Sequence, residues 1–125
     1  MYACPDPDII NFINNFTIEK RLLISKTLID KSSNVIPIIV GRGEIETTPP
    51  INRNKFLSNK DTLFGSFALE LRKYMPTLNS NASIFYFING SIIPCHNSPM
   101  IEIYDKYKSP DNFLYILYTI ENTFG

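Results

Sequence analysis

The sequence carries no excess of charge of either sign, because its 12 basic and 12 acidic side chains cancel over 125 residues. A chain that binds nucleic acid usually presents a strongly basic stripe, so we expect no nucleic-acid partner. No run approaches eighteen apolar residues, and we therefore expect no helix that spans a bilayer. The first residues lack a charged segment followed by an apolar run, so we expect no signal peptide.

Cysteine and histidine are also scarce, which limits the chemistry open to the chain. Cys4 and Cys95 are distant and no secretion signal is evident, so we expect free thiols. Cys95 precedes His96, but a catalytic pair needs a third orienting group and none is evident. A Cys–His metal site needs about four ligands. We also find no phosphate-binding glycine loop and no paired acid and base, so we expect no catalytic residue, no metal, no cofactor and no enzyme.

Apolar side chains make up 44% of the sequence, enough for the core of one domain. Four of them recur at helical spacing near the start of the chain: Ile9, Phe12, Ile13 and Phe16. They predict a helix that opens with capping residues at Asp6 and extends to Phe16. Thr17 is expected to cap a second helix, which runs to about Lys31 and ends at Ser32.

The middle of the sequence predicts two strands and a helix. Residues 35–40 form a β-branched run typical of a buried strand, and Pro37 predicts that one side of this strand is unpaired near it. Residues 55–58 predict a short second strand. Asp61 or Thr62 is then expected to cap a helix that reaches about Tyr74.

That predicted helix should turn four apolar residues inward: Leu63, Phe64, Phe67 and Leu71. Gly65 lies inside it and costs about 1 kcal/mol relative to alanine. We therefore expect close packing at Gly65.

The last third predicts a strand over residues 83–88, a turn at Asn89-Gly90, a short return strand at residues 92–93, a helix over residues 100–107 and a final strand over residues 113–118. A hairpin, a helix and further strands form the β-grasp arrangement. The last strand is expected to lie parallel beside the first, because the intervening helix supplies the long crossover. The predicted fold class is α+β, a ubiquitin-like β-grasp with two additional N-terminal helices.

Several short motifs resemble, in their order and spacing, those of one family. They are Ile18-Glu19-Lys20-Arg21, Val35–Val40, Lys55-Phe56-Leu57, Gly65-x-Phe67, Leu71-Arg72-Lys73, Phe85-Tyr86-Phe87-Ile88-Asn89, Phe113-Leu114-Tyr115 and the ending Glu121-Asn122-Thr123-Phe124-Gly125. Each is similar to a motif of the autophagy-related ubiquitin-like modifiers, the family of GABARAP and the microtubule-associated light chain. The resemblance covers Ile18 to Gly125.

The resemblance implies a division into three parts. Residues 1–17 would form a helical extension, residues 18–120 a ubiquitin-like domain that includes the second helix, and residues 121–125 a flexible conjugation tail. Gly125 would be adenylated by an E1-like activating enzyme, carried by an E2-like conjugating enzyme and transferred to the amine of phosphatidylethanolamine. Glycine suits this role because a carboxylate without a neighbouring side chain can thread a narrow enzyme channel.

The resemblance also implies partners and a location. A cysteine protease would mature the protein or remove it from lipid, and Arg72 and Phe124 are expected to contact the processing or activating enzyme. The protein would be cytoplasmic, and after lipidation it would lie on autophagosomes or related vesicles. There it would recruit receptors that carry an aromatic-x-x-aliphatic motif.

Such a peptide adds a strand to an exposed sheet edge, here expected at residues 55–58. Six positions match the family's pocket for the aromatic side chain: Leu28, Pro37, Ile39, Lys55, Leu57 and Phe113. Five positions match the pocket for the aliphatic side chain: Phe56, Ser58, Thr62, Phe67 and Leu71. Arg53 and Lys55 are expected to meet acidic residues upstream of the motif.

This sequence departs from the family at both pockets. Ile24 stands where the family has an acidic residue. Ser58, Asn59, Thr62 and Glu70 replace residues that are mostly apolar in the family, which predicts an altered or weaker preference at the fourth motif position. For the apolar residues of both pockets, core packing is the alternative interpretation.

Two alternatives remain for the whole protein. One is a modifier of the same fold that is joined to a protein lysine. The other is a ubiquitin-like binding module that is not conjugated.

Overall fold

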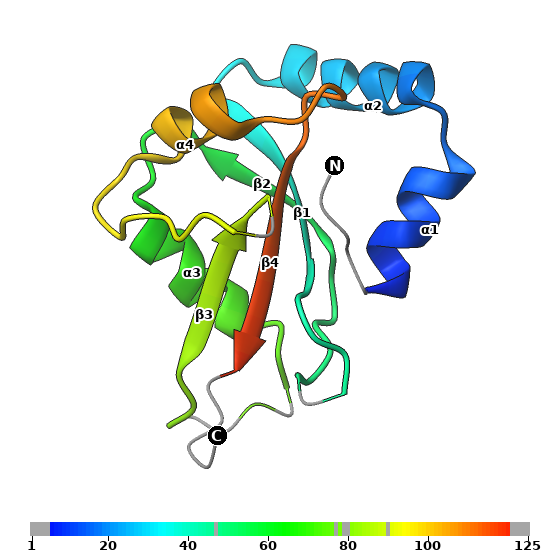
Figure 1. The fold of residues 1–125 in the computed structure, drawn as a ribbon. Helices are drawn as coiled ribbons and strands as arrows, with labels where there is room; N and C mark the ends of the chain where they lie inside the picture. Colours follow the sequence, from blue (N-terminus) through cyan, green and yellow to red (C-terminus); the bar gives the residue numbers. More distant parts are fainter. Residues whose placement is uncertain (1–5, 47, 77, 79–80, 90, 121–125) are drawn as a thin grey trace.

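The computed structural model describes residues 6–46, 48–76, 78, 81–89 and 91–120. Within these residues the elements follow in this order: α1 (Pro7–Asn15), α2 (Ile18–Lys31), β1 (Val35–Arg42), β2 (Lys55–Asn59), α3 (Phe64–Arg72), β3 (Ile84–Ile88), α4 (Met100–Tyr107) and β4 (Leu114–Ile120) (Figure 1). The predicted ubiquitin-like α+β fold with two N-terminal helices is confirmed.

The strands form one sheet with the order β2-β1-β4-β3, so β2 and β3 are its edges. The last strand lies parallel beside the first, as predicted, whereas β2 pairs antiparallel with β1 and β3 antiparallel with β4. On its β4 side, β1 begins to pair at Ile38, opposite Leu114. Pro37 lies just before this point, which confirms that one side of the strand is unpaired near the proline.

Helices cover both faces of the sheet (Figure 1). Along β1 the even-numbered residues Ile36, Ile38 and Val40 belong to the larger core, which also contains side chains of α3 and α4. Ile39, between them, belongs to a second core that contains side chains of α1 and α2. β4 alternates in the same way between the two cores, so its first five residues are buried. A strand buried on both faces is expected to read as a continuous apolar run.

The two N-terminal helices begin where the sequence predicts. The Asp6 carboxylate accepts a hydrogen bond of 2.9 Å from the backbone N–H of Asp8, and the Thr17 hydroxyl accepts one of 3.2 Å from Lys20. These side chains satisfy donors that the first turn of a helix leaves free. Both caps are therefore confirmed.

The predicted start of α3 is wrong. The helix begins at Phe64, Leu63 is its N-cap without a side-chain hydrogen bond, and neither Asp61 nor Thr62 caps it. Leu63, predicted to face inward, is exposed by 41%. The first N–H groups of the helix donate instead to a distant segment: Phe64 to the Ser98 carbonyl at 2.9 Å and Gly65 to the His96 carbonyl at 3.0 Å.

Two further predictions concern the same region. A Cβ added to Gly65 would lie 3.2–3.3 Å from atoms of His96, so the expected close packing is confirmed. The return strand predicted at residues 92–93 is wrong, because only a single bridge joins Ile92 to Ile88. Within the described part of the chain, no helix is long and apolar enough to cross a membrane.

Candidate functional site

The outer edge of β2 is the feature around which the predicted site residues gather. Lys55, Leu57 and Asn59 are exposed, whereas Phe56 and Ser58 are buried. In the register of the sheet Lys55 lies opposite Ile39, and Leu57 opposite Pro37. Cross-strand partners share a face of a sheet, so these two pairs lie on the face that α1 and α2 cover.

The residues predicted for the aromatic pocket meet on this face. Ile39 and Phe113 are buried in the second core, and Leu28 of α2 packs against that core. Pro37 is buried and lies opposite Leu57, which is exposed by 46%. The buried residues Ile39 and Phe113 thus form the floor of the predicted pocket, and the exposed Leu57 lies on the same face at the edge of the sheet. Ile24, the predicted departure from the family, also packs against the second core.

One residue at this pocket was not predicted to lie there, namely Phe12 of α1. Its ring meets the ring of Phe113 edge-on with 5.4 Å between centroids, and the ammonium of Lys55 lies 5.0 Å from its centroid. A cation over an aromatic face is attracted by the negative face of the ring. The helical spacing of Phe12 with Ile9 and Phe16 predicted a helix, but not this contact.

The residues predicted for the aliphatic pocket lie on the opposite face of β2. Phe56, Phe67 and Leu71 are buried in the larger core, where the rings of Phe56 and Phe67 meet edge-on at 6.1 Å. Ser58 is also buried and Thr62 is half-buried. The structure therefore brings the three apolar residues together. Their burial fits packing in the larger core as well as the wall of a pocket.

Arg53 and Lys55, the two cations predicted to meet acidic partners, project from opposite faces of the edge. The guanidinium of Arg53 lies 5.2 Å from the ring centroid of Phe56 and 5.9 Å from that of Tyr74, and its Nε donates to the Lys55 carbonyl at 2.7 Å. Neither cation belongs to an ion pair between described residues. Glu70 of α3 pairs with Lys73 at 2.9 Å.

The predicted enzyme contacts lie elsewhere. Arg72 is half-buried at the end of α3, and its Nη1 donates to the Ala82 carbonyl at 3.0 Å. Phe124 and Gly125 lie outside the described residues. β4 leads to them, because it ends at Ile120, opposite Ile84 of the edge strand β3.

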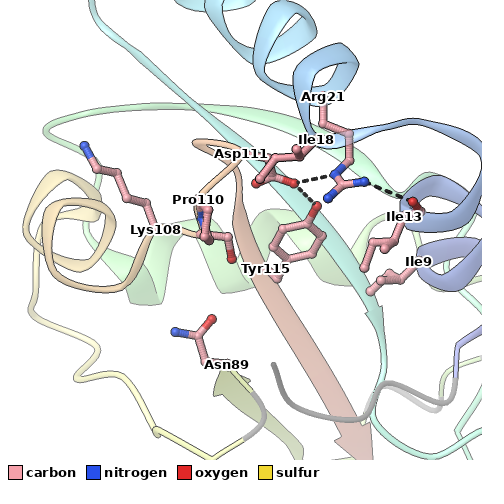
Figure 2. Close-up of a pocket in the computed structure, with 10 residues that line it drawn as sticks. Ile9, Ile13, Ile18, Arg21, Asn89, Lys108, Pro110, Asp111 and Tyr115 are labelled. Carbon is pink, nitrogen blue, oxygen red and sulfur yellow. Dashed lines mark hydrogen bonds and ion pairs between the residues drawn. The ribbon is translucent and has the colours of Figure 1, made fainter.

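A buried ion pair fixes the two N-terminal helices to the rest of the domain (Figure 2). Arg21 of α2 donates from Nε to Asp111 at 3.0 Å, and its Nη1 donates to the carbonyls of Ile13 and Phe16 at the end of α1. Asp111 also accepts hydrogen bonds from the hydroxyl of Tyr115 and from the N–H of Phe113. One network thus ties α1, α2 and the start of β4 together.

The titration of two tyrosines is shifted by burial in the larger core. Loss of contact with water raises the pKa of Tyr86 to about 12, and it raises the pKa of Tyr118 still further above its ordinary value. Burial disfavours the charged phenolate. Both hydroxyls donate to backbone carbonyls, Tyr86 to Ala68 and Tyr118 to Pro49, so we assign these groups to packing.

The part of the chain that the structure describes contains no group of three or more His, Cys, Asp or Glu side chains that could hold a metal ion. Cys95 is exposed and unbridged there, whereas Cys4 lies outside the described residues.

Comparisons with known proteins point to one family. The family described as "Autophagy protein Atg8 ubiquitin like" matches residues 20–125. An autophagy-related protein 8-like protein of Dictyostelium discoideum is 37% identical over 92% of this chain and 93% of its own length. Autophagy-related protein 8 of the same organism is 35% identical, with the same coverage of both chains.

Solved structures agree with the sequence comparison. Trypanosoma brucei ATG8 superposes with a TM-score of 0.79 at 29% identity, covering 91% of this chain and 97% of that one. A Plasmodium falciparum Atg8, solved in complex with a Plasmodium falciparum Atg3 peptide, gives a TM-score of 0.75 at 27% identity, covering 85% and 92%.

Proposed function

Because this chain belongs to the Atg8 family of ubiquitin-like autophagy proteins, we propose that it is a modifier joined through Gly125 to the amine of phosphatidylethanolamine. Atg8 proteins are ubiquitin-like modifiers rather than enzymes. The family match runs to the last residue of the sequence, so it includes the tail that would be conjugated. An E1-like enzyme activates the Gly125 carboxylate, an E2-like enzyme carries it as a thioester, and a cysteine protease matures or releases the protein.

Conjugation to lipid would change how the protein associates with membranes. Each methylene buried in a bilayer contributes about 0.8 kcal/mol, and stable anchoring takes two acyl chains. One phospholipid supplies two. The conjugate is therefore held on autophagosomal membranes, whereas the free protein is cytoplasmic.

Lipidation with purified activating and conjugating enzymes tests this part of the proposal. The reaction contains phosphatidylethanolamine vesicles and either the natural chain or Gly125→Ala, and the product is followed by gel mobility and mass. We expect a product heavier by one phospholipid from the natural chain only. A product heavier by the mass of a second protein would instead show conjugation to a protein lysine. If active enzymes gave no product at all, the result would favour a binding module that is not conjugated.

The edge strand β2 supports the second part, the docking of receptor peptides. Its outer side lies at the border of the sheet, and Leu57 is exposed by 46% beside the buried floor of Ile39 and Phe113. A peptide that adds a strand here gains main-chain hydrogen bonds, and its aromatic side chain enters the pocket on the face of Lys55 and Leu57. The Atg3 peptide bound by the Plasmodium falciparum Atg8 shows that a relative binds a peptide of a conjugating enzyme.

Calorimetric titration of an aromatic-x-x-aliphatic peptide tests the docking site. Leu57→Glu places a charge in the proposed site and is expected to weaken binding at least about tenfold, which corresponds to about 1.4 kcal/mol. Leu69→Glu, at a leucine of α3 exposed by 68%, is the matched control and should bind like the natural chain. If Leu57→Glu and the natural chain bound the peptide with equal affinity, the proposal that β2 is the docking edge would be wrong.

The polar residues of the second pocket support an altered motif preference. Ser58 and Thr62 offer less apolar surface than aliphatic residues, and each Å² of lost burial removes about 25 cal/mol. We therefore propose weakened selection at the fourth motif position. A peptide series with apolar, polar and basic residues there measures this selection, and an undiminished aliphatic preference would contradict it.

A further inference from the structure

A second hollow adjoins the predicted aromatic pocket at the start of β2. It has a volume of about 260 Å³ and shares Ile39 and Lys55 with that pocket. Asn54 lines it from the side of the sheet, and Asp8 and Asn11 line it from α1. We call it the α1 hollow. A peptide that docks along β2 and extends past the aromatic pocket toward Asn54 runs over it.

The order of the two predicted pockets along β2 gives a docked peptide its direction. The aromatic pocket includes Lys55 and Leu57, and the aliphatic pocket extends to Ser58 and Thr62, which come later in the chain. A peptide whose aromatic residue precedes its aliphatic residue therefore runs parallel to β2. The residues upstream of the aromatic residue then lie beside Asn54, at the α1 hollow.

The upstream side chains of such a peptide are divided between two faces. Successive side chains of a strand point to opposite faces. The aromatic side chain enters on the face of Lys55, so the residue two positions before it points to the same face, toward the α1 hollow. The residue directly before it points to the opposite face, where the guanidinium of Arg53 lies 5.2 Å from the ring centroid of Phe56.

The start of α1 lies at the level that the residue two positions upstream would reach. Phe12 of α1 lies beside Lys55, whereas Asp6, the cap of this helix, lies beside Gly41: a Cβ there would be 3.3 Å from the Cβ of Asp6. In the register of β1 with β2, Gly41 lies two residues beyond the partner of Lys55, which is about 7 Å. Asp8, in the first turn of α1, therefore lies upstream of Phe12 along the path of the peptide.

The charged side chains that line the α1 hollow are Asp8 and Lys55. The ammonium of Lys55 lies 5.0 Å from the ring centroid of Phe12, at the level of the aromatic residue. Asp8 is exposed and belongs to no ion pair between described residues, whereas the neighbouring carboxylate of Asp6 is paired with Arg42 at 3.3 Å. The Asp8 carboxylate is thus the charge that an upstream residue on this face meets.

We propose, on the basis of the peptide docking put forward above, that the α1 hollow selects a basic residue two positions before the aromatic residue of a receptor peptide. The Asp8 carboxylate attracts this residue, and the amide oxygen of Asn11 can accept a hydrogen bond from it. An acidic residue is preferred directly before the aromatic residue, on the face of Arg53. Receptors are then distinguished by the order of a basic and an acidic residue, and the predicted preference for acidic partners is narrowed to one position.

Calorimetric titration with three peptides tests this selection. The peptides differ only in the residue two positions before the aromatic residue, which is Lys, Gln or Glu. At low ionic strength the natural chain should bind the Lys peptide most tightly and the Glu peptide least tightly, with at least about a threefold difference between these two, because an exposed charge pair contributes up to about fivefold and salt screens it.

Two variants of Asp8 assign the selection to this carboxylate. Asp8→Lys should reverse the order of the three peptides, and Asp8→Asn should bind all three about equally. The helix cap is Asp6, so both changes leave it in place. Asp105→Lys makes the same change of charge at an exposed residue of α4. It is the matched control and should keep the order of the natural chain.

The Leu57→Glu variant separates this proposal from the docking on which it rests. Tighter binding of the Glu peptide than of the Lys peptide to the natural chain, equal binding of the two, or a preference for Lys that survives in Asp8→Asn would overturn the proposal. If Leu57→Glu still weakened all three peptides, docking along β2 would stand without it. If Leu57→Glu weakened none of them, the docking edge and the selection by Asp8 would both be wrong.

Discussion

Asp111 and Arg21 form a contact between residues 90 positions apart that the sequence did not predict. Each residue type is common on protein surfaces, and pattern reasoning has no means of pairing them over that separation. In the structure both are buried, with side-chain exposures of 4% and 10%. Removal of one member of a buried pair leaves the other charge uncompensated.

Asp111→Asn is therefore expected to lower the free energy of unfolding by about 3 kcal/mol, as measured by urea denaturation. Glu70→Gln removes a carboxylate from the exposed pair with Lys73 and serves as the control. Exposed pairs contribute little, so its midpoint should stay that of the natural chain. If both variants unfolded at the natural midpoint, the buried network would not stabilise the fold.

Tyr86 gives the stability a dependence on alkaline pH. Burial raises its pKa in the folded state to about 12, whereas an exposed tyrosine titrates near 10. Between these values the unfolded chain loses the phenol proton and the folded chain keeps it. The stabilisation is complete below about pH 10 and is lost as pH rises toward 12, by about 1 kcal/mol per pH unit.

The Tyr86→Phe variant isolates this contribution. It also loses the hydrogen bond to the Ala68 carbonyl, so it should be less stable than the natural chain at pH 9. From pH 10 to 11.5 its stability should fall less steeply. Parallel pH profiles of the two proteins, from urea denaturation, would contradict the shifted titration of Tyr86.

At the scale of elements, the sequence predicts the end of a helix correctly where residues next to that end determine it. The helix α2 begins after its Thr17 cap and α4 spans residues 100–107, both as predicted. The start of α3 was missed because its first N–H groups donate to the carbonyls of His96 and Ser98, some thirty residues later. At the predicted return strand of residues 92–93, a single bridge joins Ile92 to Ile88 in place of a strand.

The docking of α1 on the sheet depends on the absence of a side chain at Gly41. A Cβ there would overlap the Cδ1 of Ile9 and lie 2.9 Å from its Cγ1. Gly41→Ala is therefore expected to destabilise the protein by about 1–3 kcal/mol through overpacking. Ile9→Val alone should cost about 1 kcal/mol.

The combination of the two changes tests the cause. Ile9→Val removes Cδ1, the atom that an alanine at position 41 would meet. The double variant should therefore be more stable than the sum of the single effects predicts, which a double-mutant cycle in urea measures. Strict additivity would show that the two residues do not oppose each other across this contact.

At the scale of the whole molecule, the cancelled charges predict how the free protein meets membranes. A net formal charge of zero gives no long-range attraction to anionic lipid. In vesicle sedimentation the unconjugated chain should stay in the supernatant at any fraction of anionic lipid. Lipidated protein should pellet with the vesicles. Pelleting of the unconjugated chain with anionic vesicles would contradict this prediction and would indicate a basic face that the net charge of zero does not reveal.

The candidate site was predicted from the sequence only in part. The sequence pattern located the strands, and the family resemblance assigned Lys55 and Leu57 to one pocket and Phe56 and Ser58 to the other. The structure places the first two residues on one face of β2 and the last two on the opposite face. Neither the pattern nor the resemblance placed Arg53 and Lys55 on opposite faces, or Phe12 beside the first pocket, because both depend on how loops and helices return to the sheet. The roles of Gly125 and of the pocket residues are predictions that the experiments above test, and the enzyme contact of Phe124 stays a prediction.

The parallel pairing of β1 and β4 at the centre of the sheet has a mechanical consequence. The strand that leads to the C-terminus is bonded on both sides, to β1 and to β3. Traction applied to an anchored C-terminus would run along β4 and load two ladders of hydrogen bonds in shear, so that many must fail together. When force acts between the C-terminus and the folded domain, the domain should unfold at a much higher force than one tethered through an edge strand. The hydrogen bonds of an edge strand would open one after another.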